Sequence, residues 1–169
     1  MLGSLMATVC TWTVGIFFLG YLIPHLFVAW FYRTKNLKKS YKASWALVTG
    51  SSSGIGKSFA KRLASQGLNV VLVSLDDELL ESTHRELSEA YPDVLFRKIG
   101  VNLGKPGYMP KIAGETADID IQCVFLNAGY VLTGFFDSHD VEKHMQNMEC
   151  NATSAVQITH LLLQRMVRI

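Results

Sequence analysis

Hydrophobic and polar residues fall into blocks along this chain, and the blocks differ in length and period. The first block, residues 5–32, contains no Asp, Glu, Lys or Arg, and 13 of its residues are Leu, Ile, Val or Phe. A helix rises about 1.5 Å per residue, so this block is longer than the roughly 30 Å hydrocarbon core of a bilayer. The pattern predicts a transmembrane helix over residues 5–32.

Two other interpretations of this apolar block stay open. A cleaved signal peptide has a basic segment before a shorter apolar run, and this block has neither feature. A hairpin that enters one leaflet and turns at Pro24 is the second alternative. The aromatic residues suited to a membrane interface are Trp12, Tyr21, Trp30, Phe31 and Tyr32.

After a polar segment, short apolar runs alternate with segments of helical period. The runs that predict buried strands are residues 45–49, 69–74, 95–101 and 121–126. The segments that predict helices are residues 57–66, 76–90, 109–116 and 140–167. Such alternation is typical of an α/β fold, in which a doubly wound sheet of parallel strands has helices on both faces. The expected divisions are a basic linker at 33–44 and one folded domain at 45–169.

Positive charge is concentrated directly after the apolar block. The basic residues there are Arg33, Lys35, Lys38, Lys39 and Lys42. The formal net charge of the chain is +2, so the remainder is acidic, and no Asp or Glu precedes Asp76. A nucleic-acid-binding protein is disfavoured because the basic residues form one short cluster. By the positive-inside rule, the cluster predicts that the following domain lies on the cytosolic face of a membrane.

Cysteine and histidine positions do not predict a metal site. Cys10, Cys123 and Cys150 are odd in number and too far apart for a Cys-x-x-Cys zinc site or a disulfide framework. His139, His144 and His160 lack the i, i+4 spacing of a helical ligand pair.

The most informative motif lies between the first predicted strand and its helix. Its residues are Gly50, Ser51, Ser52, Ser53, Gly54, Ile55 and Gly56. Glycines at a strand-to-helix turn let the backbone approach a pyrophosphate, which the helix N-terminus then stabilises. A P-loop needs four residues between its glycines, whereas Gly50 and Gly56 have five between them. The loop therefore predicts a dinucleotide site, with a turn that binds no ligand as the alternative.

This loop and three later positions together resemble the short-chain dehydrogenases/reductases. Thr49-Gly50-x-x-x-Gly54-Ile55-Gly56 resembles the cofactor loop of that family. Asn127-Ala128-Gly129, after the fourth predicted strand, resembles its second signature, with Leu126 in place of the first Asn. Asn102 stands where members often have an Asp that holds the adenine, and Asn151 matches the Asn of the family's catalytic tetrad.

The resemblance implies a partial Rossmann fold that binds a nicotinamide dinucleotide. The loop of Gly50 to Gly56 would hold the pyrophosphate, and Asn102 and Asn127 would lie near the adenine and its ribose. Ser74 and Leu75 occupy the places where an acid or an Arg usually decides between cofactors, so neither signal is present. Asp76-Asp77 is more typical of a helix start than of a ribose site.

The N-terminal block and the Gly-Ile-Gly-Lys-Ser loop further resemble the membrane-bound branch of the family. That branch includes 17β-hydroxysteroid, very-long-chain 3-oxoacyl-CoA and ketosphinganine reductases. The resemblance implies NADP(H) rather than NAD(H), a lipid-like ketone substrate, and a single-pass protein of the endoplasmic reticulum membrane with its domain on the cytosolic face. The competing class is a non-catalytic, membrane-tethered dinucleotide-binding protein.

The family's proton-transfer residues have no match in this chain. Members carry a Ser and a Tyr-x-x-x-Lys motif, and no Tyr here is followed by Lys four residues later. We therefore expect this chain alone to show no ketone reduction. A truncated gene model or isoform is the favoured explanation; a partial chain and a protein completed by a partner are the others. In the family's sheet a fifth strand lies beside the fourth, and no run here matches it. The resemblance therefore implies an open edge at residues 121–126 that accepts a second copy or a completing partner.

Overall fold

The computed structural model describes residues 2–31 and 35–167. These residues form two compact units, divided between Lys35 and Asn36. The expected interfacial Tyr32 and the basic Arg33 lie outside the described residues.

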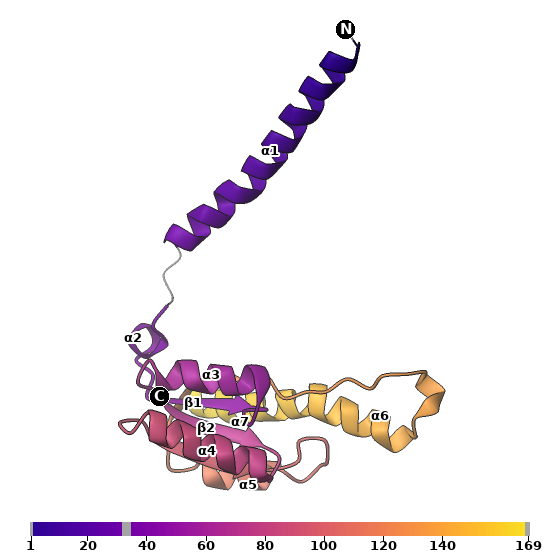
Figure 1. Cartoon of the computed structure of the whole chain (residues 1–169). Coiled ribbons are helices and arrows are strands. Elements are labelled where there is room, and N and C mark those ends of the chain that lie inside the picture. The colour runs from indigo at the N-terminus through magenta and orange to yellow at the C-terminus, as the bar shows by residue number, and fades with distance from the viewer. Residues whose placement is uncertain (1, 32–34, 168–169) are drawn as a thin grey trace. The chain divides into compact units, whose positions relative to one another are not determined.

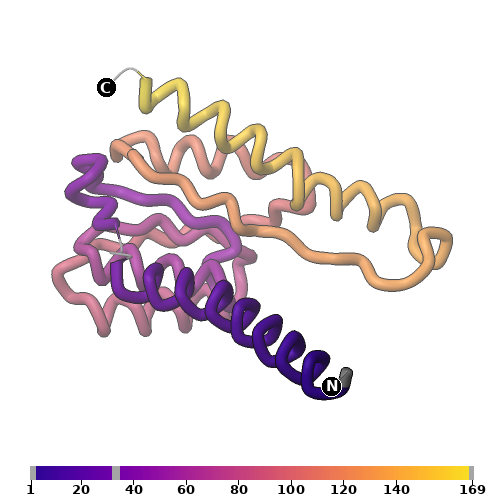
Figure 2. Tube along the Cα trace, turned by 90° about the horizontal axis from the view of Figure 1, so that it is seen from above, coloured from indigo at the N-terminus to yellow at the C-terminus, as the bar shows by residue number. Residues whose placement is uncertain are grey.

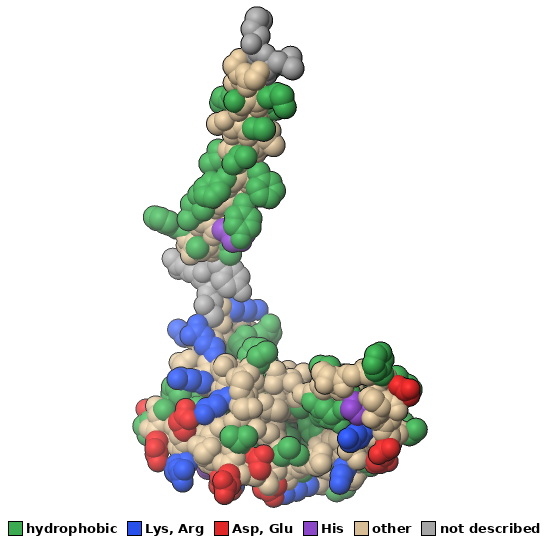
Figure 3. Space-filling model, turned by 45° about the vertical axis from the view of Figure 1, so that its right-hand side comes forward, with side chains coloured by type: hydrophobic (Ala, Val, Ile, Leu, Met, Phe, Trp, Pro, Cys, Tyr) green, Lys and Arg blue, Asp and Glu red, His purple; other side chains and the backbone are tan. Residues whose placement is uncertain are grey.

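The first unit is a single helix, α1 (Leu2–Phe31), which continues through Pro24 (Figure 1). Its polar side chains bond within the helix: the Thr8, Thr11 and Thr13 hydroxyls each donate to the carbonyl four residues earlier at 2.8–2.9 Å. Hydrophobic side chains cover its length (Figure 3). Gly3–Phe31 spans 29 residues and contains an 18-residue stretch with a mean hydropathy of 1.9, so this helix is long and apolar enough to cross a membrane.

The second unit is built on four parallel strands. They are β1 (Trp45–Thr49), β2 (Asn69–Ser74), β3 (Phe96–Gly100) and β4 (Ile121–Phe125), in the order β3-β2-β1-β4. All three strand pairs are parallel, with Trp45 beside Asn69 and Val70 beside Phe96 in the register. The structure thus confirms the doubly wound parallel sheet predicted from the apolar runs.

Helices cover both faces of this sheet (Figure 2). The helices of the unit are α2 (Leu37–Tyr41), α3 (Gly54–Ala64), α4 (Glu78–Ala90), α5 (Met109–Glu115), α6 (Val141–Met148) and α7 (Ser154–Met166). Two shorter turns complete it, the 3₁₀ turn η1 (Phe136–Ser138) and the π-helical turn η2 (Glu149–Thr153). The helix predicted over 140–167 is therefore interrupted by one wide turn, which its apolar periodicity did not indicate.

Alternating residues of the strands divide the core into two layers. Val48, Val70 and Leu72 pack with α3 and α4 on one face. Leu47 and Val71 pack with α5 and α7 on the other face. Because successive side chains of a strand point to opposite faces, a continuous apolar run is what a sheet covered on both sides requires.

Within the described residues, β4 pairs with β1 only, so its other backbone edge is open. The side chains of β4 are nevertheless half-buried after Ile121. The rings of Phe59 on α3 and Phe125 lie 5.2 Å apart, and Val124 packs with the core on the α7 side. The open part of this edge is therefore chiefly its row of backbone donors and acceptors, the feature to which another strand pairs.

Part of the segment expected to be a linker is folded against the domain. Leu37, in α2, packs on the core beside α3. The Leu37 N–H donates to Gln66 Oε1 at 2.7 Å, and Lys38 Nζ donates to the Gly67 carbonyl. These contacts attach α2 to the end of α3, so the second unit begins at Asn36 and not at Trp45.

Candidate dinucleotide-binding site

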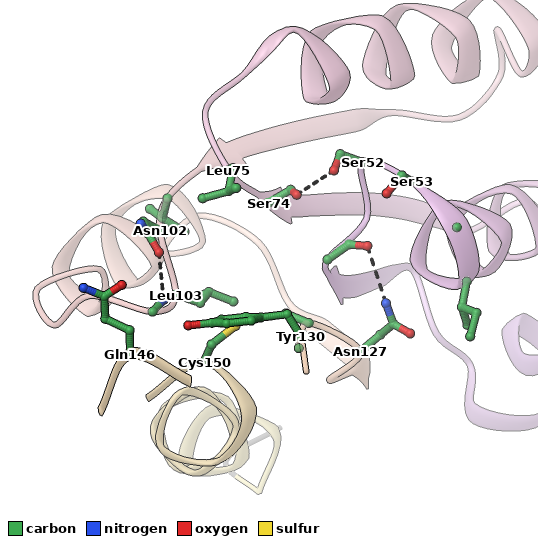
Figure 4. A pocket seen from close by; sticks show the side chains of 17 residues that line it. Ser52, Ser53, Ser74, Leu75, Asn102, Leu103, Asn127, Tyr130, Gln146 and Cys150 are labelled. Atoms are coloured by element: carbon green, nitrogen blue, oxygen red, sulfur yellow. Dashed lines mark hydrogen bonds between the residues drawn. The ribbon is translucent and has the colours of Figure 1, made fainter. Parts of the chain in front are cut away.

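A cavity of about 660 Å³ lies at the carboxyl ends of the strands (Figure 4). Its lining comes from the loop after β1, the end of β2, the segment after β3, the segment after β4, and the α6–η2 helix. The residues that line it are Gly50, Ser52, Ser53, Gly54, Ile55, Ser74, Leu75, Val101, Asn102, Leu103, Gly104, Asn127, Ala128, Gly129, Tyr130, Gln146 and Cys150. Open parallel sheets bind ligands at this edge, and the volume suits a small-molecule site.

The glycine loop wraps closely around the start of α3. A Cβ on Gly56 would lie 2.1 Å from the Gly50 carbonyl oxygen, so only glycine fits there. Gly54 has φ +54° and faces open space. Ser53, the N-cap of α3, makes no side-chain capping bond. The first N–H groups of α3 therefore lack the usual side-chain acceptor and can bind an anion such as a pyrophosphate.

The Thr49 hydroxyl joins the ends of β1 and β4. Its buried Oγ1 accepts from the backbone N–H groups of Asn127 and Ala128, both at 2.9 Å. Asn127 Nδ2 in turn donates to the Thr49 and Gly50 carbonyls, at 3.3 and 3.4 Å. The bonds hold Asn127 against the glycine loop, so the two signatures separated by some 75 residues share one wall of the cavity.

Asn102 stands at the opposite end of the cavity. Its Oδ1 accepts from the Gly104 N–H at 2.9 Å (Figure 4). This turn fixes the side-chain amide in place and leaves Nδ2 as the donor that it can offer to a ligand.

A pair of serine hydroxyls closes the end of the cavity between the loop and β2. Ser52 Oγ and Ser74 Oγ lie 2.8 Å apart. The Ser52 carbonyl accepts from Thr83 of α4 at 2.7 Å, which fixes the loop from behind. Ser51 is fully buried and bonds to the Val73 carbonyl, so it supports the loop and does not line the cavity.

The far wall of the cavity consists of residues that the sequence motifs did not indicate. Figure 4 shows the Tyr130 ring lying across the cavity, next to the sulfur of Cys150 and toward Gln146. Gln146 and Cys150 are four residues apart on the same helical segment, a spacing that puts both on one face. Burial raises the pKa of the Cys150 thiol, so it stays protonated at neutral pH and is no thiolate nucleophile.

Asn151 lies beside this cavity and binds Tyr130. Its Oδ1 accepts from the Tyr130 N–H at 2.9 Å, and its Nδ2 donates to the Tyr130 carbonyl at 2.8 Å. Asn147 Nδ2 donates to the same carbonyl at 2.6 Å. Asn151 lines the neighbouring hollow formed by residues 130–151 and is absent from the lining of the cavity at the strand ends.

A buried tyrosine supports the π-helical turn that presents Cys150 and Asn151. Tyr108 is 3% exposed, and its hydroxyl donates to Glu149 Oε1 at 2.6 Å. Burial, together with this bond to Glu149, raises the pKa of Tyr108 above its ordinary range. Ser154 Oγ donates to the Cys150 carbonyl at 2.8 Å, which satisfies a group that the wide turn leaves free.

The predicted site residues thus fall into two groups. Those that line the cavity are Gly50, Ser52, Ser53, Gly54, Ile55, Asn102, Asn127, Ala128 and Gly129. Those that lie behind or beside it are Ser51, Gly56 and Asn151. Among the described residues, no group of three His, Cys, Asp or Glu side chains is placed to hold a metal ion.

The residues present fit a nicotinamide dinucleotide. The cavity combines an uncapped helix start, a positive-φ glycine and amides at its two ends, which are groups suited to a pyrophosphate and to adenosine. The lining includes no Asp, Glu, His, Lys or Arg. Its described residues can bind and orient a ligand, and Tyr130 and Cys150 are the side chains of the lining that carry an ionisable proton.

Comparisons with known proteins agree with this geometry. The family model for short chain dehydrogenase matches residues 44–169. A very-long-chain 3-oxoacyl-CoA reductase-B of Danio rerio is 34% identical over 143 residues, which cover 82% of this chain and 46% of that protein. A putative steroid dehydrogenase 3 of Caenorhabditis elegans is 36% identical over 101 residues, 59% of this chain and 32% of that protein. The chain spans less than half the length of these curated relatives.

A solved structure gives the same result for the fold. A short-chain dehydrogenase from Sphingobium yanoikuyae in complex with NADPH superposes with a TM-score of 0.68 at 26% identity, covering 73% of this chain and 49% of that one. The family model covers nearly all of the second unit, and its region contains the glycine loop, Asn102 and Asn127. The chain belongs to the short-chain dehydrogenase family.

Proposed function

We propose that this chain is the cofactor-binding part of a membrane-anchored oxidoreductase that reduces a lipid-like ketone. The observation that carries the proposal is the cavity at the strand ends, where the glycine loop, Asn102 and Asn127 converge. Family membership makes the cofactor a nicotinamide dinucleotide, which supplies or accepts the hydride when bound. Related structures solved with NADPH favour NADP(H), a property of those proteins, whereas the lining of this cavity contains no cation for a 2′-phosphate.

The chain's own residues would bind and orient this cofactor. The start of α3 and Gly54 would hold the pyrophosphate, because N–H groups there face the cavity without a side-chain cap. Asn102 would bind the adenine end. Tyr130, Cys150 and Gln146 form the opposite wall and would exclude water from the cofactor. Asn151 would position Tyr130 through its paired hydrogen bonds.

The lipid-like substrate is proposed from the relatives. One is named a very-long-chain 3-oxoacyl-CoA reductase and another a putative steroid dehydrogenase. A ketone dissolved in a bilayer is best reached by an enzyme held at its surface, which agrees with the long apolar α1. Ketones of sphingoid bases are also lipid-like, and we propose them as a third substrate class.

We also propose that α1 anchors the chain in the endoplasmic reticulum membrane in a single pass. Support comes from the 29-residue apolar span and from the lysines after it, Lys35, Lys38, Lys39 and Lys42, which favour a cytosolic domain. Expressed in cells, the chain should resist alkaline carbonate extraction, and its second unit should be digested by protease added to intact microsomes. Release by carbonate, or protection of the second unit, would refute the topology.

A non-catalytic, tethered dinucleotide-binding protein is the second candidate. It is favoured by one observation: no Tyr in the sequence is followed by Lys four residues later, so the family's Tyr-x-x-x-Lys motif has no match among these residues. Sequencing the transcript beyond the codon for Ile169 separates the two candidates. A reading frame that continues with a Ser and a Tyr-x-x-x-Lys motif supports the enzyme, and a stop codon supports the binding protein.

The open edge of β4 is the proposed place of completion. A further strand, from a longer form of this protein or from a second copy, would pair with its backbone. Hydrogen exchange of the β4 amides would report this pairing: they should exchange faster in the 169-residue chain than those of β1. Equal protection in a monomer would argue against an open edge.

A further inference from the structure

The adenosine ribose of the cofactor would lie at the end of the cavity between β2 and β3. Figure 4 shows Ser52 and Ser74 turned toward each other, with Leu75 next to Ser74 and Asn102 beyond Leu75. The ribose of a dinucleotide lies near the end of the second strand in this class of fold, and an acid there binds a 2′-hydroxyl while an Arg binds a 2′-phosphate. Any selection between the two nucleotides rests on the proposed function, the binding of a dinucleotide in this cavity.

No cation is placed to meet a 2′-phosphate among the described residues of this cavity. All its lining residues are uncharged, and the half-exposed side chain at the end of β2 is Leu75. Three lysines of the surrounding elements lie outside this lining and are already bonded. Lys57 pairs with Glu86 at 2.6 Å, Lys98 pairs with Glu81, and Lys111 Nζ donates to the Gly100 carbonyl at 2.8 Å.

The residues directly after Leu75 are acidic. Asp77 caps α4 by accepting from the Leu80 N–H at 3.0 Å. The Asp76 carboxyl group lies against Gly100 at the end of β3, since a Cβ on Gly100 would be 2.4 Å from Asp76 Oδ1. A phosphate monoester carries about −1.5 to −2 charges at neutral pH, so a 2′-phosphate in this cavity would find no cation in the lining to compensate it.

The serine pair suits a hydroxyl. Ser52 Oγ and Ser74 Oγ already exchange one hydrogen bond at 2.8 Å, and each can donate and accept. A ribose 2′-hydroxyl can join such a pair without bringing charge into it.

We infer that this cavity selects the dinucleotide with a free 2′-hydroxyl, NAD(H), and that Leu75 together with the Ser52–Ser74 pair sets the selection. This departs from the NADP(H) implied by the family resemblance. Lys105 lies three residues after Asn102 in the sequence and outside the lining. A contact between Lys105 and a 2′-phosphate would weaken the preference for NAD(H).

The test measures binding of NADH and NADPH to the full chain in detergent by nucleotide fluorescence, with competition by ADP-ribose and 2′-phospho-ADP-ribose. Wild type should bind NADH at least tenfold more tightly than NADPH. Leu75→Arg should strengthen the binding of NADPH at least tenfold and change the binding of NADH less than threefold. Leu79→Arg adds the same charge at an exposed position on α4 and should leave the ratio of the NADH and NADPH affinities unchanged.

The outcomes separate the two proposals. The selection is overturned if the wild type binds NADPH as tightly as NADH or more tightly. It is also overturned if Leu75→Arg leaves the ratio of the two affinities unchanged. Either result leaves dinucleotide binding intact. Binding of neither nucleotide overturns the proposed function and, with it, the selection.

Discussion

Asn151 binds the backbone of Tyr130 at two points, because its Oδ1 accepts from the Tyr130 N–H and its Nδ2 donates to the Tyr130 carbonyl. The residue that the motif suggested as catalytic thus has both ends of its amide engaged in holding the wall of the cavity. The catalytic role that the family resemblance implies for Asn151 stays a prediction.

Replacing Asn151 tests this positioning role. Asn151→Ala removes both bonds and should lower the free energy of unfolding by about 1 kcal/mol, since each exposed hydrogen bond contributes about 0.5–1.5 kcal/mol. Dinucleotide affinity should fall several-fold because Tyr130 loses its fixed place. Urea unfolding and nucleotide titration measure the two effects. Gln157→Ala, an exposed change on α7, is the control and should alter neither.

The Thr49 hydroxyl should be indispensable for joining β1 to β4. Thr49→Val keeps the shape but leaves the N–H groups of Asn127 and Ala128 without their acceptor. Each unsatisfied buried donor costs about 1–3 kcal/mol, so we expect a loss of at least about 2 kcal/mol in urea unfolding. Thr49→Ser retains the hydroxyl and should lose less than half as much; equal losses would contradict the assigned bonds.

Gly56 should tolerate no side chain. Gly56→Ala would place a Cβ 2.1 Å from the Gly50 carbonyl oxygen and 2.7 Å from Asn127 Nδ2. Overpacking of this kind costs about 1–3 kcal/mol, and the clash with backbone puts this variant at the upper end. Gly114→Ala in α5 has no neighbour within 4 Å and should be neutral or stabilising by up to about 1 kcal/mol. A thermal melt of both variants compares them directly.

Tyr108 should make the chain sensitive to alkaline pH. Its pKa is raised in the folded state, so the folded chain keeps a proton that the unfolded chain loses. The stabilisation is complete below the unfolded pKa of about 10 and declines as pH rises above it. Absorbance at 295 nm should show one tyrosine that ionises late, and Tyr108→Phe should remove that step. A late step that persists in Tyr108→Phe would contradict the assignment.

Local patterns were sufficient to predict most of the fold. The four apolar runs became the four parallel strands, because residues such as Leu47 and Val71 are buried on one face while Val48 and Val70 are buried on the other. The glycine loop was predictable for the same reason, since its conformation depends on its own φ angles and on the close approach of Gly56 to Gly50.

Features that depend on distant contacts were not predictable. Helix α2 is short, and it is attached by bonds from Leu37 and Lys38 to residues some 30 positions later. The π-helical turn depends on Tyr108 reaching Glu149 across 41 positions. Tyr130 directly follows the second signature, which ends at Gly129. This adjacency is the one signal that could have indicated that Tyr130 forms part of the cavity wall.

Direct binding of a nicotinamide dinucleotide to the full chain tests the central claim. In detergent, NADH fluorescence should rise saturably, ADP-ribose should compete, and Gly54→Val should weaken binding at least tenfold because its side chain would enter the cavity at the start of α3. Gly107→Val, also at a positive-φ glycine in open space but outside the lining, should bind as the wild type does. No saturable signal up to about 1 mM, the upper end of ordinary enzyme affinities, or binding that Gly54→Val leaves unchanged would contradict the account.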